Sequence, residues 1–127
     1  MNNLKNKVLL VDDDPMMAKM YQRFLEGEGF EFAAAFNGEE GLAVIKKDRP
    51  DIILLDIMMP KMSGLATLKV IKADPNLKDI PVVILTNLGD WSEDIENCKK
   101  LGAEDYWVKA NMSLKEVGER IRKILTK

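Results

Sequence analysis

The sequence predicts an α/β domain in which a five-stranded parallel sheet has helices on both faces. Short apolar runs at 8–11, 52–55 and 82–85, bounded by charged or turn residues, are typical of strands buried on both faces. Weaker strand patterns at 31–36 and 105–108 are expected nearer the sheet edges. A helical pattern follows each run, so strand and helix alternate five times, which implies right-handed crossovers between parallel strands.

Each expected helix also has a boundary signal. Two begin with the spacing of a capping box, in which glutamate follows the cap residue by three positions: Asn37 with Glu40, and Ser113 with Glu116. The other three are followed by residues that end helices: Gly29, Pro75 and Gly102.

Length and composition limit the function classes. The 127 residues suit a single domain over 1–127, with a core of about 6–126, and we expect no output domain. A net charge of −2 gives no basic excess for nucleic acid or an anionic membrane, so neither is an expected partner. The chain has no histidine, which excludes histidine catalysis and histidine metal ligation. A lone cysteine, Cys98, and the lack of a signal peptide pattern favour the cytoplasm.

Polar residues follow the strands where ligands of an open parallel sheet collect, beyond the carboxyl ends of the strands. These residues are Asp12 and Asp13, Asp56, Thr86 and Lys109. Any one of them could simply mark where the chain leaves the core, but their coincidence at one edge favours a site. Two carboxylates 4 Å apart repel by about 4 kcal/mol at an effective dielectric of 20, so the cluster needs a cation or a proton. Mg²⁺ is the expected ion, with Mn²⁺ as a substitute.

Asp56 is the candidate nucleophile, because a carboxylate can form an acyl phosphate and its neighbours need only position and neutralise the transferred group. We expect Lys109 to place a positive charge on one phosphoryl oxygen. We expect Thr86 to donate a hydrogen bond to another.

Four fragments in this order resemble the response-regulator receiver family of bacterial two-component systems. They are VLLVDDDP at 8–15, LLDIMMPKMSG at 54–64, the strand end at Thr86, and YWVK at 106–109. The resemblance covers nearly the whole chain. It implies the flavodoxin-like strand order 2-1-3-4-5, for which a chemotaxis receiver is a standing example.

The resemblance also implies roles for individual residues. Asp12 and Asp13 would form the acidic pocket, with Asp12 acting through water. Asp13, Asp56 and the main-chain carbonyl of Met58 would bind the metal directly. Thr86 and Tyr106 would form the switch pair, and Lys109 would be the family's site lysine.

Two positions depart from the family pattern. Ala110 follows Lys109 where the family usually has proline after a cis peptide bond. A cis bond before a residue other than proline costs about 3 to 4 kcal/mol, so we expect a trans bond here. Asn87 follows Thr86 where the family usually has a small residue, and its amide would either restrict access to Asp56 or add a hydrogen bond.

The sequence favours a phosphoacceptor switch, not a metabolic enzyme. Asp56 would accept phosphate from a sensor histidine kinase or a histidine phosphotransfer protein, and a changed surface would then alter contacts with a downstream protein. Two alternatives remain: a small Mg²⁺-dependent phosphatase with an aspartyl nucleophile, and an adaptor with the receiver fold that is not phosphorylated.

Several other residues are assigned to packing. The acidic run continues into Asp14, which we expect to be solvated or to cap a helix. Cys98 is expected to be a buried thiol. Trp91 is expected to lie in the loop before the fourth helix, either as packing at the helix entry or as part of the moving region. Methionine at helical spacing more often fills core gaps than lines a binding surface, and we expect packing roles for Met16, Met17, Met20, Met58, Met59 and Met62.

Overall fold

A computed structural model describes residues 6–57, 59, 62–86 and 92–126, with the backbone alone at 92–95. Its five strands form one parallel sheet in the order β2-β1-β3-β4-β5, which confirms the predicted order. The strands are β1 (Lys7–Val11), β2 (Glu31–Ala35), β3 (Ile52–Asp56), β4 (Val82–Thr86) and β5 (Asp105–Val108). The two weaker strand patterns form the edge strands β2 and β5, as expected.

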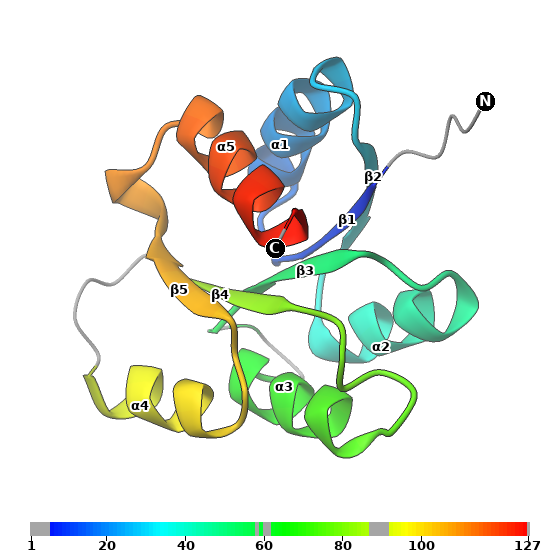
Figure 1. The fold of residues 1–127 in the computed structure, drawn as a ribbon, viewed down its shortest axis with the longest axis vertical. Helices are drawn as coiled ribbons and strands as arrows, with labels where there is room; N and C mark the ends of the chain where they lie inside the picture. The colour runs from blue at the N-terminus through cyan, green and yellow to red at the C-terminus, as the bar shows by residue number, and fades with distance from the viewer. Residues whose placement is uncertain (1–5, 58, 60–61, 87–91, 127) are drawn as a thin grey trace.

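The helices form a layer on each face of the sheet (Figure 1). Helices α1 and α5 cover one face, and α2, α3 and α4 cover the other. Their bounds are α1 (Pro15–Gly27), α2 (Gly38–Lys47), α3 (Gly64–Ala73), α4 (Ser92–Lys100) and α5 (Leu114–Leu125), and a short 3₁₀ turn, η1 (Lys109–Asn111), follows β5. Among the described residues, none of the helices has the length and apolar character needed to cross a membrane.

The central strands divide their side chains between two cores. Along β1, Leu10 packs with the residues of α1 and α5, while its neighbour Leu9 packs on the opposite side. All five residues of β3 and all five of β4 are buried. Continuous apolar runs therefore reflect burial on both faces, because neighbouring side chains in a strand point in opposite directions.

The helix caps agree with the sequence, with one difference in detail. The side chains of Asn37 and Ser113 accept hydrogen bonds from the backbone N–H of Glu40 and Glu116. The carboxylate of Glu40 accepts instead from the N–H of Phe36, one residue before the cap, and that of Glu116 pairs with Arg120 in the next turn. In each predicted capping box the cap side chain thus accepts from the glutamate N–H, whereas the glutamate carboxylate binds another donor instead of the N–H of the cap residue.

The prediction that methionine fills core gaps is wrong for Met16 and Met20. These side chains are 73% and 54% exposed, although Met17 between them is partly buried against the core. Helix α1 buries only the stripe through Ala18, Tyr21 and Leu25, which is narrower than its apolar face. Met59 does pack against the opposite core, and Met58 lies outside the described residues.

Candidate functional site

The predicted site residues lie together at the carboxyl edge of the sheet. Asp12 directly follows β1, Asp56 and Thr86 are the last residues of β3 and β4, and Lys109 directly follows β5. Because the strands are parallel and adjacent, strand ends far apart in sequence meet at one edge. The side chains of Asp12, Asp56 and Thr86 are all buried.

Asp12, Asp13 and Asp56 form a compact cluster of carboxylates. One oxygen from each lies within 4.8 Å of the others. Asp12 and Asp56 are 1% and 6% exposed, whereas Asp13 is open to solvent. Carboxylate oxygens in this number and spacing match the preference of Mg²⁺ and Mn²⁺ for hard oxygen ligands. The acidic residues present therefore fit a divalent ion.

Lys109 supplies the positive charge of the site. Its Nζ lies 2.5 Å from Asp12 Oδ2 and 3.5 Å from Asp56 Oδ2, and its side chain is 7% exposed. An ammonium placed between two buried carboxylates offsets part of the electrostatic penalty of burying them. With all four groups charged, the carboxylates still exceed the ammonium by two charges, which is the charge of a divalent cation.

Asp14 continues the acidic run but belongs to the helix instead of the cluster. Its Oδ1 accepts hydrogen bonds from the N–H groups of Met16 and Met17, so it caps α1, one of the two roles expected for it. Its own N–H donates to Asp12 Oδ1 at 3.0 Å. The cap thereby helps to fix the orientation of the buried Asp12 carboxylate.

Gly64 permits the close return of the chain after β3. A Cβ at this position would overlap the carbonyl oxygen of Asp56 and the Cα of Ile57. The N–H of Gly64 donates to the carbonyl of Ile57 at 3.0 Å, which holds the start of α3 against the strand end. Gly64 lies within the family-like fragment, but its steric role becomes visible only when the two backbone segments are seen together.

Tyr21 is a neighbour of the site that the sequence did not single out. It lies on the buried stripe of α1 and is 5% exposed. Burial, and to a lesser degree the negative charge of Asp12, raise the pKa of Tyr21 to about 12. No sequence pattern indicated that Asp12 would lie near this tyrosine.

Thr86 and Tyr106 lie on the same side of neighbouring strands. Tyr106 pairs with Ile84 and Thr86 pairs with Val108, so the two residues are offset by one pleat along the sheet. Thr86 is 4% exposed, and Tyr106 is partly buried against the core on the side of α3 and α4. The two residues of the predicted switch pair thus lie on adjacent strands, two residues apart in register.

The loop after Lys109 differs from the family expectation as predicted. The bond from Lys109 to Ala110 is trans, because the described part of the chain contains no cis peptide bond. Met58, Asn87 and Trp91 lie outside the described residues, so their predicted roles stay predictions. Cys98 is buried as expected, with 1% exposure.

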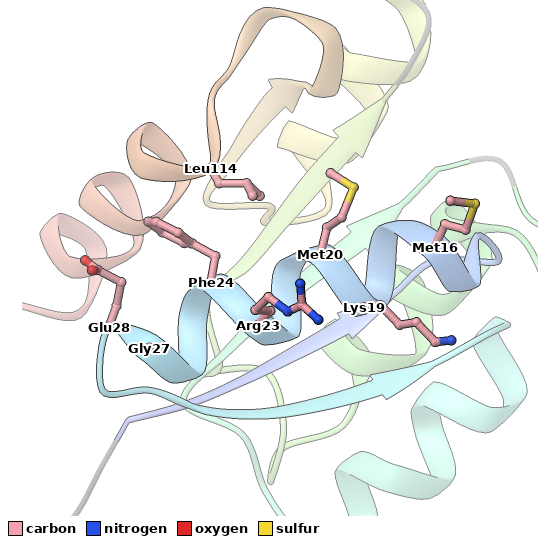
Figure 2. A pocket seen from close by; sticks show the side chains of 8 residues that line it. All are labelled: Met16, Lys19, Met20, Arg23, Phe24, Gly27, Glu28 and Leu114. Carbon is pink, nitrogen blue, oxygen red and sulfur yellow. The ribbon is translucent and has the colours of Figure 1, made fainter.

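A groove runs along α1, and Lys109 is among the residues that line it. One part is lined by Met16, Lys19, Met20, Arg23, Phe24, Gly27, Glu28 and Leu114, and Figure 2 shows these side chains on α1 and at the start of α5. The adjoining part shares Met16, Met20 and Leu114 and adds Asp14, Met17, Tyr21, Lys109, Ala110 and Met112. We call the two parts together the α1–α5 groove.

These features define a doubly wound α/β domain with an acidic, lysine-containing pocket at the carboxyl edge of its sheet. A model of the response regulator receiver domain matches residues 8–122, and the chain belongs to this family, the receiver domains of two-component systems.

The relatives are similar in both sequence and fold. The probable transcriptional regulator ycf27 of Pyropia yezoensis is 38% identical over 125 residues, which cover 98% of this chain and 49% of that protein. The chain therefore spans about half the length of the curated relatives it matches. Chemotaxis protein CheY4 of Vibrio cholerae superposes with a TM-score of 0.88 at 29% identity, over 95% of this chain and 99% of that one. The Mn²⁺-bound form of response regulator Rcp1 gives 0.78 at 29% identity, over 94% and 91%.

Proposed function

We propose that this domain is a phosphoacceptor switch in which Asp56 receives a phosphoryl group from a phosphohistidine. The observation that carries the proposal is the position of the Asp56 carboxylate. It lies at the accessible edge of the sheet, within a cluster of three carboxylates and 3.5 Å from the ammonium of Lys109. Few other structural demands would explain burying this much charge at one strand edge.

The transfer needs little from the protein beyond position and charge. An Asp56 oxygen attacks phosphorus while the phosphorus–nitrogen bond of the donor breaks, and the bonding electrons leave with the imidazole. Asp13, Asp56 and the Met58 carbonyl would bind Mg²⁺ directly and Asp12 would bind it through water, and the ion would shield the carboxylate from the anionic phosphoryl group. Lys109 neutralises one phosphoryl oxygen and Thr86 donates a hydrogen bond to another.

The phosphoryl group later leaves by attack of water on the acyl phosphate. This chemistry is part of the switch, and we propose that the domain is not a metabolic enzyme. While phosphorylated, the protein stabilises a second arrangement of Thr86 and Tyr106, which changes the surface formed by α4, β5 and α5. A downstream protein then reads that surface.

The phosphodonor is a sensor histidine kinase or a histidine phosphotransfer protein, and we propose that it docks on the α1–α5 groove. Lys109 lines the groove and lies 3.5 Å from Asp56, so a partner seated in the groove would bring its phosphohistidine near Asp56. Two exposed methionines give the groove an apolar lining, and thioether side chains adapt readily to a partner's shape. Lys19 and Arg23 also line the groove and favour acidic residues on the partner.

The central test is phosphorylation by a small phosphodonor, such as acetyl phosphate, in the presence of Mg²⁺. Mass spectrometry should find one phosphoryl group on the wild-type protein and none on Asp56→Asn. Asp14→Asn is a matched control, because asparagine caps helices as well as aspartate does and the variant should keep the phosphoryl group. A phosphorylated Asp56→Asn protein would reject the assignment. Turnover of small phosphate esters with burst kinetics would favour the phosphatase alternative.

A further inference from the structure

Lys99 of α4 contacts the aromatic ring of the switch tyrosine. Its Nζ lies 5.5 Å from the centroid of the Tyr106 ring, within the range of a cation–π interaction. The ring is partly buried against the core, while Lys99 itself is exposed to solvent. An exposed ammonium therefore covers a ring whose movement the proposed switch requires.

The end of α4 that carries Lys99 is firmly attached to the sheet. Only residues 101–104 separate α4 from β5. Within this link, the N–H of Ala103 donates to the carbonyl of Cys98 and the N–H of Glu104 donates to that of Val82. Cys98, next to Lys99, is buried. The backbone of Lys99 is thus held at a fixed place relative to β5.

The geometry gives the contact a direction. Lys99 lies in the last turn of α4, and the strand that follows, β5, begins with Asp105 opposite Val83, three residues before Thr86. Tyr106 pairs with Ile84, two residues before Thr86, which is about 7 Å along the strand. A swing of the ring toward Thr86 moves it away from the Lys99 ammonium.

We propose that Lys99 is a positioning residue that holds Tyr106 in its resting place and so sets how readily the switch turns on. The inference rests on the proposed phosphoacceptor function. Removing the ammonium destabilises only the resting state, in which the Tyr106 ring lies beneath Lys99. The equilibrium therefore shifts toward the state with the ring near Thr86, which a phosphoryl group stabilises. Exposed cation–π contacts have the strength to change such an equilibrium by about two- to fivefold.

The test measures the affinity for beryllofluoride, an acyl phosphate mimic, in saturating Mg²⁺. Lys99→Gln should lower the Kd by about two- to fivefold relative to wild type. Lys99→Arg keeps a cation over the ring and should restore the wild-type Kd. Lys100→Gln is the matched control, since it removes the same charge from the neighbouring exposed position of the helix and should leave the Kd unchanged.

A double-mutant cycle separates the ring contact from other effects. In a Tyr106→Leu background, Lys99→Gln should no longer change the Kd, because no aromatic ring remains. The inference is overturned if Lys99→Gln leaves the Kd unchanged or raises it, if Lys100→Gln has the same effect, or if the effect persists without Tyr106. Failure of the proposed function looks different: the wild-type protein would then bind no beryllofluoride.

Discussion

Lys109 lies 1 Å closer to Asp12 than to Asp56, at 2.5 Å against 3.5 Å between Nζ and the nearest carboxylate oxygens. The ammonium therefore shares the acidic pocket with the proposed cation and repels it. The same lysine stays near enough to Asp56 to meet an incoming phosphoryl group.

Removing the Lys109 ammonium should therefore affect Mg²⁺ binding and phosphorylation in opposite directions. Lys109→Ala should bind Mg²⁺ as tightly as wild type or more tightly, because a repelling charge is removed. Phosphorylation by acetyl phosphate should slow by about 10- to 100-fold, because a charge-assisted hydrogen bond is lost. Metal titration and phosphorylation rates measure the two effects. Lys115→Ala, which removes an exposed lysine of α5, should change neither quantity. A large loss of Mg²⁺ affinity in Lys109→Ala would contradict the placement of Lys109.

The close approach of Gly64 to Asp56 predicts a large cost for a single methyl group. Gly64→Ala should lower the free energy of unfolding by about 1 to 3 kcal/mol, since the Cβ overlaps backbone atoms that cannot move aside easily. Gly27→Ala is the control, because a Cβ at the end of α1 meets nothing within 4 Å and alanine favours the helix. Urea unfolding of both variants checks the difference. Equal stabilities would show that the loop relaxes freely.

The offset of one pleat between Thr86 and Tyr106 predicts coupled movement. Beryllofluoride with Mg²⁺ should shift the NMR signals of both residues together. Thr86→Ala should still bind the mimic but lose the shift at Tyr106, whereas Thr126→Ala, at the far end of α5, should behave as wild type. Shifts confined to Asp13, Asp56 and their immediate neighbours would leave a phosphate acceptor without this switch.

The exposed methionines of the α1–α5 groove give a prediction about the partner. The double variant Met16→Ser, Met20→Ser should receive phosphate from its histidine kinase or phosphotransfer protein at least about tenfold more slowly, because apolar contact area is lost at the interface. The rate with acetyl phosphate should not change, since that donor needs no docking surface. Val70→Ser is the control, because it also removes an exposed apolar side chain but lies on α3, on the opposite face of the sheet. Equal slowing with both donors would place the methionines in the site itself and not at a docking surface.

The raised pKa of Tyr21 predicts a loss of stability at alkaline pH. The pKa of Tyr21 is about 12 in the folded protein and about 10 in the unfolded chain. The contribution of this difference to the free energy of unfolding is therefore fully present below about pH 10. As pH rises from about 10 toward 12, the folded state loses this advantage. Between pH 8 and pH 11 the wild-type protein should lose about 1 kcal/mol more unfolding free energy than Tyr21→Phe. Urea unfolding at the two pH values checks this, and parallel losses would refute it.

The sequence by itself determined the order of strands and helices and the convergence of the site. Continuous apolar runs can be satisfied only by burial on both faces, and parallel strands must then bring Asp12, Asp56, Thr86 and Lys109 to one edge. These features depend on local periodicity and on the alternation of strands and helices, both of which can be predicted from the sequence.

Tertiary structure alone decided which groups meet across that edge. The apolar stripe of α1 is wider than the surface that α5 and the sheet cover, so Met20 became exposed although its spacing predicted burial. The same holds for the nearer approach of Lys109 to Asp12, the proximity of Tyr21 to that carboxylate, and the contact of Lys99 with Tyr106. Each depends on how two separate elements pack against each other, and no local pattern specifies that packing.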